Sequence, residues 1–107
     1  MDPGQPICIS DVVVSTAGRD KGQYFYVIGC DQTYLTLADG KGRTLEKPKK
    51  KKRIHAQKVL RSETRVAEKL RAGDKVLNGE LRRDLAFFEP GNAGEQPRRL
   101  TTWQKTT

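Results

Sequence analysis

Hydrophobic positions in the first half of the chain come in short runs. β-Branched and aromatic side chains dominate residues 7–15, 23–28 and 33–38, and polar stretches that contain glycine or aspartate separate these runs. Such runs are typical of β-strands, because branched and aromatic side chains pack well on a pleated surface. The first half of the chain is therefore predicted to begin with three strands.

The residues that follow complete the pattern of a small barrel. Asp39-Gly40 is a strong hairpin-turn signal, so residues 41–45 are predicted to return as a short fourth strand. Residues 46–53 are too charged for a core, and Pro48 disfavours helix before it, so this segment is predicted to be a solvated loop or an edge strand. Residues 54–59 alternate weakly and predict a closing strand. About five short strands in so few residues predict a mainly β fold, a small β-barrel.

The period of the hydrophobic positions changes after residue 60. Ser62 is predicted to cap a first short helix that ends at Gly73, and Asn78 to cap a second that ends at Pro90. Helices this short need a partner, so both are expected to dock on the barrel. The predicted apolar faces consist of Val66, Ala67 and Leu70 in the first helix and of Leu81, Leu85 and Phe88 in the second.

These patterns divide the chain into one small domain with extensions. A flexible lead-in over residues 1–6 precedes the barrel at 7–60, and a helical extension covers 61–90. Residues 91–107 are polar and predict a disordered tail. Trp103 lies in that tail without apolar neighbours that could form a core around it.

Composition limits the class of protein. In 107 residues with 35% hydrophobic content, one modest core fits but two do not. No stretch approaches the roughly 20 apolar residues of a membrane helix, and the N-terminus lacks a signal-peptide pattern, so we expect a cytoplasmic protein. Cys8 and Cys30 are far apart in the sequence, and in a reducing compartment we expect two ordinary thiols.

Positive charge is concentrated in one segment. Residues 41–61 carry ten Lys or Arg and a single acid, Glu46, for a local charge of +9, whereas the whole chain carries +8. The remainder of the chain is therefore close to neutral. A concentration of this kind predicts a polyanionic partner, of which nucleic acid is the commonest. A solvated basic loop and a nuclear import signal are the alternatives for the consecutive cations Lys49 to Arg53.

Catalytic and metal-binding patterns do not emerge from the sequence. His55 is the single histidine, and with two scattered cysteines it cannot complete a zinc-ligand set. Gly18 and Gly22 are not followed by the Gly-Lys-Ser/Thr ending of a phosphate-binding loop. We therefore expect neither catalysis, nor a cofactor, nor a small-molecule substrate.

The order of the motifs resembles a known RNA-binding family. Residues 12–14, then Gly18-Arg19-Asp20-Lys21-Gly22, then residues 25–28 are similar to the KOW motif, two barrel strands joined by a loop with Lys-Gly near its end. Residues 37–43, the Lys-Pro-Lys run at 47–52 and His55 add a likeness to the short bacterial KOW-domain proteins related to archaeal and eukaryotic large-subunit ribosomal proteins. The resemblance covers about residues 8–60 and lacks the further glycine that many transcription-factor-type KOW motifs have where Phe25 stands here.

The resemblance implies an SH3-like barrel that binds structured RNA, ribosomal RNA in particular, and that associates with the ribosome. Lysines would contact phosphates, and arginines would add bidentate phosphate contacts or stacking. The implied RNA-binding residues are Arg19, Lys21 and Gly22 in the KOW loop, and Arg43, Lys47, Lys49, Lys50, Lys51, Lys52, Arg53 and His55 in the basic segment.

Aromatic residues on the predicted strands leave two roles open. Alternation places Tyr24 and Tyr26 on one face and Phe25 on the other. One face would form the core while the other packs against the helices, or Tyr24 and Tyr26 would stack on unpaired bases. A module that binds proteins through these aromatics is the alternative function. Duplex DNA is a weaker candidate, because no recognition helix is predicted.

Overall fold

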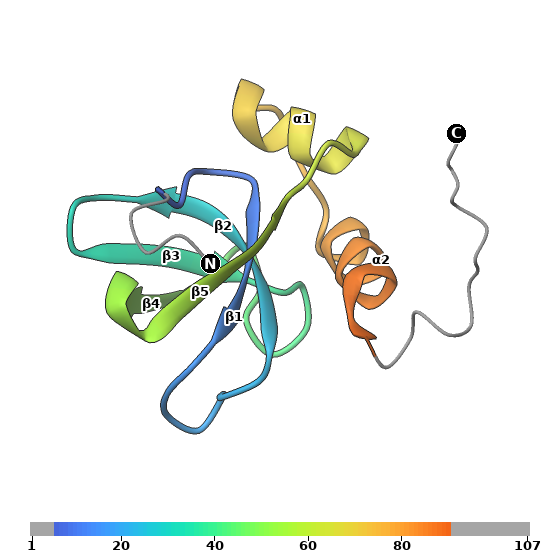
Figure 1. Cartoon of the computed structure of the whole chain (residues 1–107). Helices are drawn as coiled ribbons and strands as arrows, with labels where there is room; N and C mark the ends of the chain where they lie inside the picture. The colour runs from blue at the N-terminus through green and yellow to red at the C-terminus, as the bar shows by residue number, and fades with distance from the viewer. Residues whose placement is uncertain (1–5, 91–107) are drawn as a thin grey trace.

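The computed structural model describes residues 6–90 (Figure 1). The predicted tail over 91–107 with Trp103, and all of the predicted lead-in except Pro6, lie outside this range. Within it, the elements in chain order are β1 Asp11–Ser15, β2 Tyr24–Cys30, β3 Tyr34–Ala38, β4 Lys49–Lys52, the 3₁₀ turn η1 Arg53–His55, β5 Ala56–Arg61, α1 Arg65–Ala72 and α2 Asn78–Phe88.

The strands of residues 6–90 form one antiparallel sheet in the order β4-β3-β2-β1-β5. β4 and β5 are at opposite ends of this order, yet only the three residues Arg53–His55 join them. The four steps from Lys52 to Ala56 span at most about 14 Å, whereas four strand spacings in a flat sheet are about 19 Å. The sheet is therefore strongly curled, which gives the molecule its barrel-like form (Figure 1).

Two hydrophobic clusters lie on the two faces of the curled sheet. The inner cluster contains Val13, Phe25 and Leu35, and the outer cluster contains Val12, Tyr26 and Leu81. α1 and α2 lie on the same side of the sheet and cover the outer cluster (Figure 1). The predicted fold class, a small barrel-like β fold with two short helices after it, is confirmed. Among residues 6–90 no helix is long and apolar enough to cross a membrane.

Two strand predictions were wrong in their details. β1 begins at Asp11 rather than at residue 7, because Ser10 adopts a left-handed backbone conformation with φ of 77°. Residues 41–45 form a turn instead of the predicted fourth strand, since Asp39 Oδ1 accepts hydrogen bonds from the amides of Lys41 and Arg43, both at 2.9 Å. The fourth strand is β4, so the edge-strand alternative for residues 46–53 was the right one.

The helices occupy the predicted segments, but other residues cap them. Thr64 rather than Ser62 caps α1, and its Oγ1 accepts from the Ala67 amide at 3.2 Å. Gly73 ends α1 as predicted, with φ of 77°. Asn78 is already inside α2, and its side chain accepts from the Leu45 amide at 2.8 Å instead of capping the helix.

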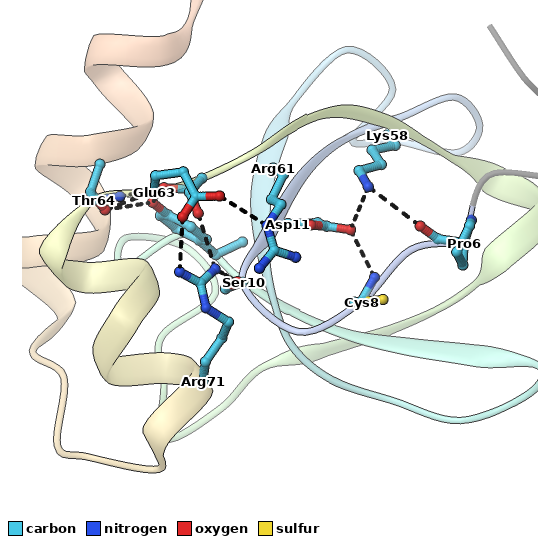
Figure 2. Close-up of polar contacts among 11 residues, drawn as sticks. Pro6, Cys8, Ser10, Asp11, Lys58, Arg61, Glu63, Thr64 and Arg71 are labelled. Atoms are coloured by element: carbon cyan, nitrogen blue, oxygen red, sulfur yellow. Dashed lines mark hydrogen bonds and ion pairs between the residues drawn. The ribbon is translucent and has the colours of Figure 1, made fainter.

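Polar side chains also fix the helices to the sheet. The Tyr26 hydroxyl on β2 donates to Asp84 Oδ2 on α2 at 2.7 Å and lies 2.8 Å from Ser62 Oγ. On α1, Arg71 donates to Ser10 Oγ at 2.7 Å (Figure 2). Strand β2 and the residue before β1 are thus held to the helical region by polar contacts as well as by the outer cluster.

Figure 2 also shows how the start of β1 is held to β5. Asp11 is fully buried, and its Oδ2 lies 3.2 Å from Lys58 Nζ and accepts from the Cys8 amide at 2.8 Å. Lys58 in turn approaches the Pro6 carbonyl at 3.5 Å. A buried carboxylate with a cationic partner and an amide donor is the expected way to place Asp11 inside the fold.

Candidate nucleic-acid interface

The lysine run is not a free solvated segment, because strand pairing divides its side chains between two faces. β4 pairs with β3, and alternate residues point in opposite directions. Lys49 and Lys51 turn toward the β1–β2 loop, and Lys51 is only 8% exposed. Lys50 and Lys52 point the other way and are exposed. Half of the run therefore serves the fold and half is presented to solvent.

Asp20 is the residue that joins the lysine run to the predicted KOW loop. Its Oδ1 lies 3.1 Å from Lys51 Nζ, and its Oδ2 lies 3.2 Å from Lys49 Nζ. Ser15 Oγ donates to Oδ1 at 2.7 Å, and Lys51 also donates to the Ala17 carbonyl at 3.0 Å. The two segments that the sequence singled out are thus in direct contact, through a carboxylate that was not among the predicted site residues.

The charge state of Asp20 follows from this environment. Burial alone raises the pKa of its carboxyl group, but the hydrogen bond from Ser15 and the ammonium groups of Lys51 and Lys49 outweigh burial and lower the pKa from 3.8 to about 2. Asp20 is therefore ionised at neutral pH and neutralises part of the lysine charge. Lys51, almost completely buried on Asp20, cannot also reach a phosphate, so its predicted RNA contact was wrong.

A basic depression lies where the two loops meet. A hollow of about 310 Å³ is lined by three cations, Arg19 from the β1–β2 loop, Arg43 from the β3–β4 loop and Lys49 from β4, which outnumber its two carboxylates, Asp20 and Asp39. Arg19 and Arg43 are exposed, while Lys49 is partly buried and retains 26% side-chain exposure beside Asp20. The term basic depression is used below for this hollow. The structure thus brings together predicted site residues from three separate segments.

The remaining predicted residues differ in what they can present. The Arg53 side chain stabilises the fold, because its guanidinium donates to the Asp31 carbonyl at 2.7 Å and to the Ile7 carbonyl at 3.1 Å. Lys50 lies over the Tyr34 ring at 5.9 Å from the centroid. The other predicted residues of the basic segment and the KOW loop have exposed side chains or, for glycine, an exposed backbone, and they are Lys21, Gly22, Lys47, Lys52 and His55.

Gly22 has a conformational role in the KOW loop. Its φ of 91° lies in the left-handed region, and its amide donates to the Ser15 carbonyl at 2.8 Å. This turn brings the chain back into β2 and holds Lys21 at the outside of the loop. The predicted glycine is therefore important for the shape of the loop, whatever the loop contacts.

Tyr24 and Tyr26 do share one face, as predicted, and that face packs against the helices. Tyr26 has no exposed surface, so its predicted stacking role was wrong. Phe25 is also buried, in the inner cluster. Tyr24 is half-buried and lines a hollow, so a stacking role remains open for this residue alone of the pair. Burial of Tyr26 and Phe25 leaves Tyr24 and Tyr34 as the partly exposed aromatic residues of the strands, so a protein-binding groove on the strands would depend on these two.

Metal-binding groups do not converge within residues 6–90. In that part of the chain no three His, Cys, Asp or Glu side chains are grouped closely enough to hold a metal ion. Cys8 and Cys30, both described, are exposed free thiols. Besides these thiols, the described surface offers a ligand positive charge, hollows and several exposed apolar side chains.

Comparison with known proteins adds no assignment. The sequence matches no protein-family model, and a search of curated proteins finds no match either. The resemblance to the KOW motif therefore stays a hypothesis that rests on the quoted residues.

Proposed function

We propose that the protein is a non-catalytic RNA-binding module that docks on structured RNA, with ribosomal RNA as the candidate ligand and the ribosome as the candidate location. One observation carries this proposal: Arg19, Arg43 and Lys49 come from three segments and line the same basic depression. Convergent cations in a concave surface suit the phosphate groups of a folded polyanion better than a scattered charge would. The resemblance of the β1–β2 loop to the KOW motif, and of the basic segment to the short bacterial KOW-domain proteins, supports RNA as the polyanion.

The proposed contacts follow from exposure. Arg19 and Arg43 would bind phosphates in the basic depression, where a guanidinium can make two parallel hydrogen bonds. Lys50 and Lys52 point away from Asp20 and would extend the contact along the outer side of β4. Lys21, Lys47 and His55 are exposed near the same loops and would contribute at the margins of the contact. Lys51 and Arg53 would support this surface from inside the fold.

Salt dependence of binding tests the proposal. A fluorescein-labelled RNA hairpin would be titrated with the full chain between 50 and 300 mM salt. Each lost phosphate contact should reduce the slope of log K against log salt by about 0.7–0.9. We expect Arg43→Gln to weaken binding and to reduce the slope by about one contact, and the double change Lys50→Gln with Lys52→Gln to reduce it by up to two contacts.

Arg65→Gln is the matched control, because Arg65 is exposed at the start of α1, away from the two loops, and the substitution removes the same charge. This variant should bind as the wild type does. If Arg43→Gln loses no more affinity than Arg65→Gln, the basic depression is not an RNA site. If the Lys50/Lys52 variant loses no more affinity than Arg65→Gln, the outer side of β4 does not contact RNA. Stronger binding to a peptide library than to RNA, insensitive to salt, would instead support the protein-interaction function.

A further inference from the structure

A second hollow continues from the basic depression toward the end of α2. It has a volume of about 300 Å³ and shares Gln23 and Asp39 with the basic depression. A third hollow overlaps the second and continues past it to Pro90. The hollows form one groove between the barrel loops and α2. The part of the groove termed the tyrosine pocket is lined by Tyr24, Lys41, Arg82, Leu85, Ala86 and Glu89.

We propose that the tyrosine pocket binds one unpaired nucleotide of the RNA, with its base against Tyr24 and its phosphate beside Lys41 and Arg82. This inference rests on the proposed function, because the nucleotide would belong to the strand whose backbone lies in the basic depression. The pocket volume is near the lower end of the range for small-ligand sites, roughly 300–1,000 Å³, so it suits a single flat base rather than a duplex.

Tyr24 supplies a fixed aromatic surface in the pocket. It lies on β2 and pairs with Val14 of β1, and its side chain packs at the margin of the outer cluster. A ring held by neighbouring side chains loses little conformational entropy when a base stacks on it. Base–aromatic stacking adds affinity for an unpaired base, because every base has a flat face that can lie on the ring. Tyr24 differs in this respect from Tyr26, which is completely covered.

The two cations of the pocket are placed by the fold. Arg82 on α2 donates from one guanidinium nitrogen to the Gly40 carbonyl at 2.8 Å, which fixes the guanidinium beside the β3–β4 loop. Lys41 follows in the same loop, and its amide is held by Asp39. An exposed lysine and a guanidinium fixed at the margin of a hollow can bind a phosphate that enters from the basic depression.

Glu89 gives the pocket a preference for bases that carry hydrogen-bond donors. Its carboxylate repels a phosphate but accepts hydrogen bonds from a base, so it favours the base end of a nucleotide at this end of the pocket. Guanine alone among the four bases presents two adjacent donors, N1–H and the N2 amino group, that two carboxylate oxygens can accept together. We therefore assign guanine as the preferred base, read on its Watson–Crick edge as in other single-stranded RNA sites.

Two RNA hairpins that differ by one nucleotide test this inference. One has a fully paired stem, and the other carries a single bulged guanosine in the same stem. The full-length protein should bind the bulged hairpin about tenfold more tightly than the paired one. Stacking of one base on an aromatic ring is expected to lower the dissociation constant by about that factor. Bulged uridine should bind less tightly than bulged guanosine. Equal affinities for the paired and bulged hairpins would overturn the inference.

Variants separate this inference from the proposed function. Tyr24→Leu should abolish the preference for the bulge and leave binding to the paired hairpin, whereas Tyr24→Phe should keep the preference. Glu89→Gln should reduce the advantage of guanosine over uridine. Arg43→Gln should instead weaken binding to both hairpins.

Ala86→Leu is a second test that leaves Tyr24 in place. Ala86 is exposed and lines the pocket, so a larger side chain narrows the hollow without removing a core contact. This variant should also lose the bulge preference while its thermal unfolding stays close to that of the wild type. A retained preference in both Tyr24→Leu and Ala86→Leu, with binding still sensitive to Arg43→Gln, would show that the protein binds RNA without this pocket.

Discussion

At the scale of single residues, Asp20 changes the meaning of the lysine run. The sequence shows five consecutive cations, but the structure sets two of them against one carboxylate. Ion pairs of this kind link residues far apart in the sequence, so a sum of charges over a sequence window overestimates the charge available to a ligand. The part of the run that remains for a ligand is Lys50 and Lys52, together with the exposed side of Lys49.

The stability supplied by Asp20 should depend on pH. Its pKa is lowered from 3.8 to about 2 in the folded protein, so the stabilisation is complete above about pH 4 and is lost as the pH falls toward 2. The shift corresponds to about 2 kcal/mol of unfolding free energy. Urea unfolding of the wild type at pH 6, 4, 3 and 2 should therefore show a loss of this size that Asp20→Asn does not show.

At pH 6, Asp20→Asn should itself lower the free energy of unfolding by about 3 kcal/mol, because Lys51 is left as a buried cation with only the Ala17 carbonyl. Asp74→Asn is the matched control, since Asp74 is exposed in the connection between the helices. If the two variants unfold at the same urea concentration, the Asp20 ion pairs do not stabilise the fold.

At the scale of elements, the β3–β4 loop shows what the sequence pattern could not predict. Asp39-Gly40 is a turn, as predicted, but the chain does not return directly as a strand. Asp39 holds the next amides in a wider turn, and Asn78 and Arg82 of α2 bind the same loop. The long-range partners lie more than thirty residues away. Local periodicity carries no information about them, so the fourth strand was placed too early.

Gly40 is the position at which this loop meets α2 most closely. Its φ is 79°, and a Cβ at this position would collide with the Asn78 carbonyl. Gly40→Ala should therefore lower the free energy of unfolding by about 2–4 kcal/mol, from backbone strain and displacement of α2. Thermal unfolding should detect this as a fall of at least about 8 °C in Tm.

Gly42→Ala is the control in the same loop. A Cβ at Gly42 would meet nothing within 4 Å, and Gly42 is not among the glycines with positive φ. This change should leave the Tm within about 3 °C of the wild type. Equal effects of the two substitutions would mean that the contact between the loop and α2 does not contribute to stability.

Much of the sheet was predictable because its cause is local. The runs at 23–28 and 33–38 coincide closely with β2 and β3, and alternation assigned Tyr24 and Phe25 to the correct opposite faces. The exposure of each side chain was less predictable, because it depends on which elements pack over that face of the sheet. Tyr24 and Tyr26 have the same alternation, yet only Tyr26 lies under the helices completely. The tyrosine pocket could not be predicted for the same reason, because α2 supplies half of its lining.

At the scale of the whole molecule, the sheet and the two helices behave as one unit. The outer cluster joins β1 and β2 to α1 and α2, and the Tyr26 hydroxyl connects Ser62, Thr64 and Asp84 across the same interface. Neither helix has enough length to be stable alone. The groove between the barrel loops and α2 therefore depends on the same contacts that hold the helices in place.

Alkaline unfolding tests this coupling through Tyr26. Burial, followed by the neighbouring Asp84 carboxylate, raises the pKa of the Tyr26 hydroxyl well above its usual value of 10, although the hydrogen bonds from Ser62 and Thr64 partly oppose the shift. The folded state then holds a proton that the unfolded state releases. The stabilisation is complete below about pH 10 and is lost above it, by about 1.4 kcal/mol per pH unit.

Tyr26→Phe should remove this part of the pH dependence. At pH 8 the variant should be less stable by about 1–3 kcal/mol, because the half-buried Asp84 carboxylate loses the Tyr26 donor and keeps only that from Thr64. Between pH 10 and 11.5 the wild type should lose stability faster than the variant, so the two curves of unfolding free energy against pH converge. Tyr26 contacts both Thr64 at the start of α1 and Asp84 on α2. Circular dichroism of the helices and the fluorescence of a dye attached to a barrel strand should therefore report the same unfolding transition. Loss of helix signal before the barrel unfolds would contradict a single cooperative unit, and parallel pH curves would contradict the role of the Tyr26 proton.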